Sequence, residues 1–141
     1  MSGLMLRARI VVVGDEILDG SVEDANGAWL AQRLRSLGID LDRLVVVPDD
    51  VDVIAGEVRD ALSGSRPAVV LTTGGVGGTW DDVTYQGVAR ALGVGTTVDP
   101  ELARPVEEVI SWTRSVGHRL DRDAVEGMTR IATVPEGSSG R

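Results

Sequence analysis

AVVLTTGGVGGTWDDVTYQGVARAL, residues 68–92, is the segment that decides the fold. It opens with an apolar run at 68–73, which predicts a buried β-strand, and continues into a glycine-rich loop at 74–80. A helical pattern at 83–92 follows the loop. A buried strand that leads through a loop into a helix is the repeating unit of a parallel sheet covered by helices. The segment therefore predicts an α/β protein.

The same strand and helix unit occurs twice earlier in the chain. Apolar runs at 9–13 and 44–47 predict two more buried strands, and helices are expected at 26–37 and 51–62. Three such units predict a three-layer α/β sandwich around a mostly parallel sheet. Beyond Gly93 the pattern predicts short strands at 94–98 and 131–134, a helix at 100–116, a mixed charged segment at 118–128 and a loose tail at 137–141.

Composition excludes several classes of function. The chain has no cysteine and one histidine, His118, so it has no thiolate nucleophile and cannot form a histidine metal cluster. All 14 basic residues are arginines, which excludes a P-loop lysine and a lysine Schiff base. The formal net charge of −8 opposes binding to nucleic acid.

Length and hydropathy set the domain organisation. A chain of 141 residues is long enough for one domain, so we expect a single domain over residues 1–141. No apolar run approaches the ~18 residues that a membrane helix needs, and the first nine residues lack the apolar core of a secretory signal. We therefore expect no membrane association and a cytoplasmic location.

Carboxylates follow each of the three predicted strands. Asp15 and Glu16 come after the first strand, Asp49 and Asp50 after the second, and Asp81 and Asp82 close the glycine loop after the third. Carboxyl ends of parallel strands meet at one edge of the sheet, where ligands bind, so these side chains are expected on a common rim. Each acid taken alone has a simpler explanation, as a helix cap or a solvated turn.

The glycine loop is the strongest feature of the sequence. Four glycines in five positions allow positive φ angles and a close backbone approach, and successive amides can form an anion-binding concavity. Because clustered carboxylates repel a phosphate, the combination implies Mg²⁺ between the acids and a phosphate ligand. The alternative is a tight turn before a helix capped by Asp82 or Thr84.

Two further residues leave alternatives open. Trp80 lies in the loop rather than on an apolar face. It either stacks on a flat heterocycle such as a pterin or adenine, or it serves as a hydrophobic plug or a subunit contact. Asn26 either caps the helix that begins there or hydrogen-bonds a ligand.

These segments resemble the molybdenum-cofactor biosynthesis family, the molybdopterin-binding domain of MoaB and Mog proteins, and most closely the branch that forms the N-terminal domain of CinA proteins. The stretches that carry the resemblance are Gly14-Asp15-Glu16-Ile17-Leu18 with Gly20 and Asn26, Pro48-Asp49, Thr73-Gly74-Gly75-Val76-Gly77 through Asp81-Asp82-Val83-Thr84, and the ending Val134-Pro135-Glu136-Gly137.

The resemblance implies a small-molecule site in a domain that is often trimeric. In Mog-like members the domain adenylylates molybdopterin with Mg²⁺-ATP, and the positions that match Asp49 and Asp82 are implicated in catalysis. In CinA-like members the related activity is Mg²⁺-dependent hydrolysis of a nucleotide pyrophosphate such as ADP-ribose or FAD. The expected metal ligands are Asp15, Glu16, Asp49 and Asp82, and the expected cofactor-binding residues are Thr73, Gly74, Gly75, Val76, Gly77, Gly78, Trp80, Asp81 and Thr84.

The chain departs from the family pattern in two places. Gly78 stands where the family often has proline, and Trp80 where it often has histidine or another residue, which changes the loop and its stacking face. Family members usually continue into an Asn- and Gly-rich stretch and a Leu-Pro-Gly turn, whereas this chain stops at Arg141. We therefore expect a domain truncated at its C-terminal end or a ligand site that lacks a part. A molybdopterin carrier without chemistry and a purely structural oligomerisation module remain alternatives to an enzyme.

Overall fold

The computed structural model describes residues 6–64 and 68–139. Its elements in chain order are β1 (Arg7–Val13), α1 (Asp15–Leu18), α2 (Asn26–Ser36), β2 (Asp40–Val47), α3 (Val51–Leu62), β3 (Ala68–Thr73), α4 (Thr84–Leu92), β4 (Thr96–Val98), α5 (Pro100–Ser115), α6 (Arg122–Arg130) and β5 (Thr133–Pro135). The end of the predicted tail, 140–141, lies outside the described residues.

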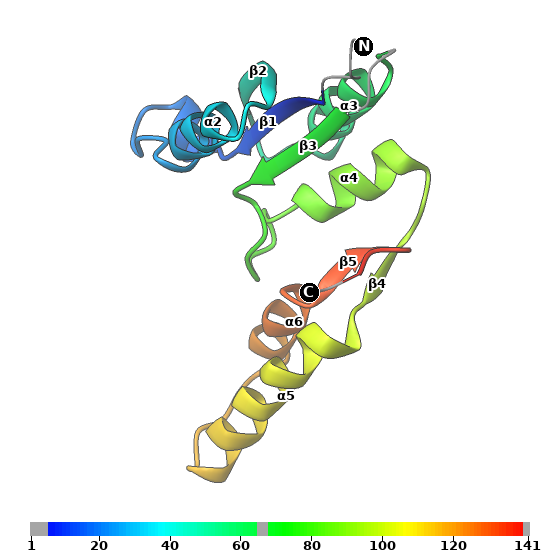
Figure 1. Ribbon diagram of the computed structural model, residues 1–141. Helices are drawn as coiled ribbons and strands as arrows, with labels where there is room; N and C mark the ends of the chain where they lie inside the picture. Colours follow the sequence, from blue (N-terminus) through cyan, green and yellow to red (C-terminus); the bar gives the residue numbers. More distant parts are fainter. Residues whose placement is uncertain (1–5, 65–67, 140–141) are drawn as a thin grey trace.

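A parallel three-stranded sheet in the order β2-β1-β3 forms the centre of the molecule (Figure 1). Helix α2 packs on one face, where Ile10 and Val12 of β1 meet Leu34. Helices α3 and α4 cover the other face, where Val11 of β1 meets Ile54 of α3. The predicted three-layer α/β sandwich is therefore confirmed, because alternate residues of β1 supply both cores.

The two outer strands of the sheet differ in charge. β2 carries Asp40, Asp42 and Arg43 in its first half. β3, over 68–73, has the sequence AVVLTT and no charged side chain, and Val69 on it is exposed. An edge strand presents unpaired backbone N–H and C=O groups on its outer side. The difference in charge between β2 and β3 therefore affects how readily another strand can pair with each of them.

The last third of the chain differs from the sequence expectation. Strands β4 and β5 lie near the predicted positions but pair antiparallel with each other in a separate two-stranded sheet. The segment 118–128, for which the sequence predicted no element, contains most of α6, whose first turn is capped by the Asp121 carboxylate accepting from the Ala124 amide at 2.8 Å. The four-residue helix α1 was not predicted either.

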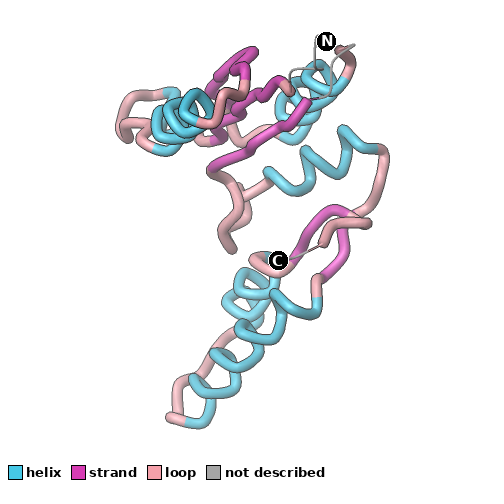
Figure 2. The backbone as a smooth tube through the Cα atoms, viewed as in Figure 1, coloured by secondary structure: helices cyan, strands magenta, loops and turns pink. Residues whose placement is uncertain are grey.

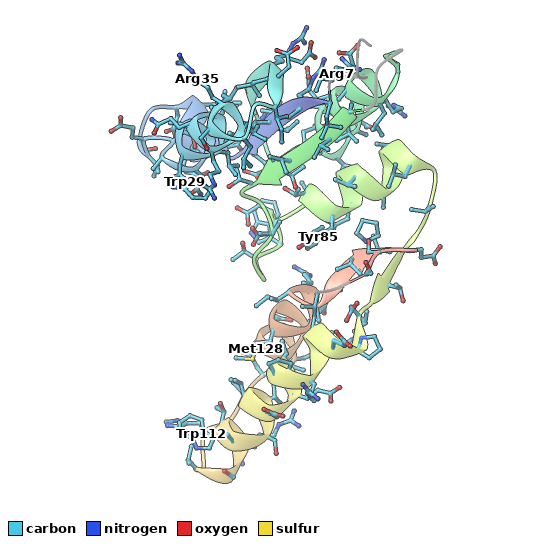
Figure 3. The ribbon with its side chains drawn as sticks, in the orientation of Figure 1. Arg7, Trp29, Arg35, Tyr85, Trp112 and Met128 are labelled. Atoms are coloured by element: carbon cyan, nitrogen blue, oxygen red, sulfur yellow. The ribbon has the colours of Figure 1, made fainter. Side chains whose placement is uncertain are left out.

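Helices α5 and α6 lie side by side in an arm that projects away from the central sheet (Figures 1 and 2). No residue of either helix is buried, and Trp112 near the far end of the arm is 65% exposed (Figure 3). Among the described residues, no helix combines the length and the apolar character needed to cross a bilayer.

A buried arginine in the central strand ties three elements together. The Arg9 guanidinium donates to Asp42 of β2 at 2.9 Å and to Asp60 of α3 at 2.6 Å, and its side chain also lies 3.5 Å from the Glu57 carboxylate. Hydrogen bonding from Arg9 lowers the pKa of both Asp42 and Asp60 below the ordinary value. Because an acid with a lowered folded-state pKa stabilises the fold above its unfolded pKa, this contribution is present at neutral pH.

Replacing this arginine is expected to destabilise the domain. In Arg9→Met the hydrogen bonds from the buried guanidinium are lost, although Asp42 keeps Arg7 and Glu57 keeps Arg43 as partners. We expect a loss of about 2 kcal/mol in the free energy of unfolding at pH 7, the order of magnitude for hydrogen bonds to charged groups. The exposed Arg43→Met is the control and should change it by less than about 0.5 kcal/mol. Urea unfolding across pH measures both, and the Arg9→Met deficit should shrink below pH 3.8, the ordinary value for the aspartates. Equal stability of the two variants at pH 7 would contradict this role.

Candidate functional site

The loops after β1 and β2 are joined at the carboxyl edge of the sheet. The Gly14 amide donates to the Val47 carbonyl at 3.0 Å. The Asp15 amide donates to Oδ2 of Asp49 at 3.0 Å, and the Asp49 amide donates to Oδ1 of Asp15 at 3.4 Å. Each acid therefore accepts a hydrogen bond from the backbone of the other, which holds two carboxylates together on the predicted rim.

The glycine loop after β3 closes onto this pair. Gly74 and Gly75 have φ angles of +85° and +60°, in the left-handed region that favours glycine. A Cβ on Gly74 would overlap the carbonyl oxygen of Val13, and a Cβ on Gly75 would stand 3.1 Å from Oδ1 of Asp49. The expectation that Asp15, Asp49 and Gly75 share one end of the molecule is confirmed.

Thr84, at the start of α4, connects the end of the glycine loop to its beginning. Its hydroxyl donates to the Gly74 carbonyl at 2.8 Å, and its amide donates to the Gly75 carbonyl at 3.0 Å. The side chain is fully buried. Thr84 thus shapes the loop in the structure, and its contact with a ligand stays a prediction.

Asp49 is in an electrostatically unfavourable position. Its partial burial raises the pKa of the carboxyl, and repulsion from Asp15, Glu16 and Asp81 raises it further, while the hydrogen bond from the Asp15 amide partly opposes the shift. Asp49 therefore lies in the electrostatic field of three other acids, of which Asp15 is the one hydrogen-bonded to it. A cation placed beside Asp49 would relieve their repulsion.

The carboxylate of Asp82 is hydrogen-bonded within the glycine loop itself. Its Oδ2 accepts from the Thr79 amide at 2.8 Å and from the Thr79 hydroxyl, and the Gly77 amide also donates to its carboxylate. Partial burial acts to raise the pKa of Asp82, but these hydrogen bonds outweigh it and hold the pKa below the ordinary value. The structure does not place Asp82 among the acids that raise the pKa of Asp49, and its catalytic role stays a prediction.

The donor set fits a hard cation that shares its coordination with a ligand. Within residues 6–64 and 68–139, no three His, Cys, Asp or Glu side chains are arranged to hold a metal ion by themselves. Mg²⁺ in proteins commonly uses one or two carboxylates and completes its octahedron with substrate phosphates and water. Asp15 and Asp49 offer such a pair beside a loop of backbone amides.

A pocket of about 190 Å³ lies between the ends of β1 and β3. The chain leaves β1 toward α2 and β3 toward α4, on opposite faces, so this is the switch point at which open parallel sheets bind ligands. Glycine-loop, acidic and amide groups line it together: Val12, Val13, Glu16, Ile17, Val22, Glu23, Asp24, Ala25, Asn26, Thr73 and Gly74. A larger hollow of about 470 Å³ between α2 and the start of β2 is at the opposite edge of the sheet and carries none of the predicted site residues.

Asn26 belongs to this pocket. Its Nδ2 donates to the Thr73 hydroxyl at 3.2 Å, whereas the helix-capping position is Ala25, which makes no side-chain cap. Asn26 therefore links the start of α2 to the end of β3 instead of capping its helix. Sequence reasoning missed Asp24, whose carboxylate accepts from the Gly27 amide at 2.9 Å; its spacing of three residues before Gly27 was the available signal.

The remaining predicted residues lie farther along the loop. Val76 is 40% and Trp80 82% exposed, and neither lines the switch-point pocket. Gly77 lies against Asp82, and a Cβ on Gly77 would stand 2.7 Å from its Oδ2. Gly78 lies against α6 instead, so the loop extends from the acidic rim to the arm.

Sequence comparison finds relatives that match most of this chain. A CinA-like protein of Frankia casuarinae is 45% identical to this chain, and the match covers 94% of this chain and 30% of that protein. A protein of Pyrococcus horikoshii is 37% identical, with 96% of this chain and 52% of its own length covered. The chain thus spans about half or less of the length of these relatives.

Solved structures show the same fold. CinA of Thermoplasma acidophilum, described as of unknown function, superposes with a TM-score of 0.75 at 27% identity, over 95% of this chain and 73% of its own. MoaB of Thermus thermophilus superposes with a TM-score of 0.57 at 19% identity, over 90% and 89% of the two chains. The family model described as a probable molybdopterin binding domain matches residues 9–135. The chain belongs to this molybdopterin-binding domain family, as its glycine loop and acidic rim indicated.

Proposed function

We propose that the domain binds the phosphate of a molybdopterin or nucleotide on its glycine loop, with Mg²⁺ between that phosphate and the Asp15–Asp49 pair. The observation that carries the proposal is the approach of Asp49 to Gly75, which sets a carboxylate directly beside a loop built for close backbone contact. Family membership supports a molybdopterin-related ligand.

The proposed roles in binding differ between the glycine loop and the carboxylates. Amides of the glycine loop are the proposed donors for phosphate oxygens, because glycines with positive φ angles let the backbone approach a ligand closely. Asp49 and Asp15 would hold the cation, and their reciprocal backbone bonds fix the distance between the two loops. Mg²⁺ bound there would supply charge neutralisation for reaction at phosphorus.

The reaction proposed first is adenylylation of molybdopterin. A terminal phosphate oxygen of molybdopterin forms a bond to the α-phosphorus of ATP, the bond from that phosphorus to the bridging oxygen breaks, and pyrophosphate leaves with the electron pair. The chain contributes alignment of the two phosphates and a fixed electrostatic environment, which are the main sources of rate in phosphoryl transfer.

Hydrolysis of a nucleotide pyrophosphate is the second candidate. The closer superposition on CinA than on MoaB favours it. In this reaction a water oxygen attacks one phosphorus of ADP-ribose or FAD, the bridging P–O bond breaks, and two monophosphates form. The two protons of the water are released when both products are dianions. The same loop and carboxylates serve both reactions, so the products distinguish them.

A thermal-shift panel tests the proposal. Molybdopterin, ATP, ADP-ribose and FAD are each added with and without Mg²⁺, since a ligand that binds only the folded state must stabilise it. A bound ligand at one hundred times its Kd adds about 2.7 kcal/mol, which raises the Tm by several degrees. We expect a shift that needs both a phosphate ligand and Mg²⁺.

The other outcomes of the panel have definite meanings. A shift that is the same without Mg²⁺ contradicts the metal bridge and identifies a carrier. No shift with any ligand contradicts ligand binding altogether and leaves a structural oligomerisation module. Chromatography of the products after incubation with ATP and molybdopterin, or with ADP-ribose, then separates adenylylation from hydrolysis.

A further inference from the structure

The outer half of the glycine loop touches α6 through two glycines. A Cβ on Gly78 would overlap the carbonyl oxygen of Gly127, and a Cβ on Gly127 would stand 2.8 Å from the carbonyl oxygen of Gly78. Figure 1 shows this loop descending from the end of β3 toward α6. The two backbones can approach this closely only because both residues lack a side chain.

A pocket of about 330 Å³ lies beside this contact. The loop supplies one wall and α6 the other: Gly78, Thr79, Trp80, Asp123, Glu126 and Arg130. None of these residues lines the switch-point pocket between β1 and β3. The glycine loop therefore has a separate pocket on each side. The volume of the pocket on the α6 side is at the small end of the range for ligand sites and suits a single ring system.

The chemistry of the two walls is complementary to a flat, nitrogen-rich ring. Trp80 is 82% exposed, so its indole offers a face for stacking. Across the pocket, Asp123 and Glu126 present carboxylate oxygens, which accept hydrogen bonds from ring N–H and amino groups. Arg130 is held by Glu126 at 3.0 Å and fixes that carboxylate in place.

Charge decides which part of a ligand enters. Two carboxylates face one guanidinium in this pocket, so its net negative charge repels a phosphate, whereas at Gly74 and Gly75 the proposed Mg²⁺ on Asp15 and Asp49 would offset the acids and let the loop amides bind one. The ring of a nucleotide or pterin suits the α6 side and its phosphate suits the other half of the loop. The separation of the two chemistries along one loop gives the ligand a direction.

We propose that the Trp80 pocket, formed with Asp123 and Glu126 of α6, binds the amino-bearing heteroaromatic ring of a ligand whose phosphate lies on the glycine loop. The inference rests on the proposed function for the phosphate end and adds a second subsite for the ring. It also assigns to the arm a direct part in binding.

Tryptophan fluorescence tests the subsite without a phosphate. The protein with Trp29→Phe and Trp112→Phe retains Trp80 alone, and the protein with Trp29→Phe and Trp80→Phe retains Trp112, far out on the arm (Figure 3), as the matched control. Titration with adenosine or with a phosphate-free pterin should quench Trp80 with saturation and leave Trp112 unchanged apart from absorption by the ligand. Asp123→Asn, which lies on the exposed surface, should weaken the binding about ten-fold.

A second measurement keeps the result independent of the tryptophan signal. Calorimetry of Mg²⁺-ATP binding should give about ten-fold weaker affinity for Trp80→Ala than for the unchanged protein, because one stacking contact is lost. Absence of quenching together with equal affinity of Trp80→Ala would overturn the subsite while leaving the phosphate site intact. Saturable quenching by adenosine or the pterin, together with no Mg²⁺-dependent thermal shift from any ligand of the panel, would overturn the proposed function and support the ring pocket.

Discussion

Gly74→Ala is expected to destabilise the domain strongly. The new Cβ would overlap the carbonyl oxygen of Val13, which is main chain of the central strand β1 and cannot move without breaking the sheet. The φ of +85° adds the strain of a left-handed conformation. Together these effects should cost more than about 4 kcal/mol, a large part of the 5 to 15 kcal/mol that holds an ordinary domain together.

Gly117→Ala is the matched control for this substitution. Gly117, between α5 and α6, has the same φ of +85°, but a Cβ there would meet nothing within 4 Å. It should cost only the backbone strain, about 1 to 2 kcal/mol. Urea unfolding of both variants measures the difference. If their free energies of unfolding differ by less than about 1 kcal/mol, the loop does not lie against β1 in the way described.

Asp49→Asn is expected to remove Mg²⁺-dependent binding and to stabilise the empty domain. Loss of one of two carboxylates that would hold the cation should weaken Mg²⁺-ATP binding by at least about a hundred-fold, because a metal ligand is lost. Asparagine keeps an oxygen that can accept the hydrogen bond from the Asp15 amide. Calorimetry in the presence of Mg²⁺ measures the loss of affinity.

The gain in stability follows from the raised pKa of Asp49. Burial and then repulsion from Asp15, Glu16 and Asp81 disfavour the charged form in the fold, so the charge destabilises the domain at pH 7. Asp49→Asn should therefore raise the Tm at pH 7, and the advantage should vanish below pH 3.8, where the carboxyl is neutral even in the unfolded chain. Glu107→Gln, on the exposed surface of α5, is the control and should show no such gain. A lower Tm for Asp49→Asn at pH 7 would contradict the electrostatic description.

The central sheet could be predicted because its signals are local. Continuous apolar strands and helices with one apolar stripe appear in the printed residues, and the predicted 51–62 and 68–73 coincide with α3 and β3. Helix α6 was missed because charges surround its few apolar residues and Gly127 interrupts them. The pairing of β4 with β5 involves two three-residue strands, whose partners depend on the tertiary structure.

The site was predicted in location and only partly in its internal arrangement. Parallel topology alone brings Asp15, Asp49 and Gly75 to one edge, so strand order was sufficient for that expectation. The orientation of Asp82 toward Thr79 and of Asn26 toward Thr73 depends on loop conformation, which residue types do not specify. The contact of the loop with α6 required a helix that the sequence pattern did not reveal.

The absence of charged side chains on the edge strand β3 has a consequence for the behaviour of the protein in solution. Natural sheets deter unwanted partners with lysine, proline or inward charges at their margins, and β2 has charges of this kind whereas β3 has none. A β-prone, apolar margin is a template on which a strand from another molecule can be laid down. Concentrated solutions of this chain will therefore tend to self-associate through that margin, and a charged residue introduced there is the natural remedy.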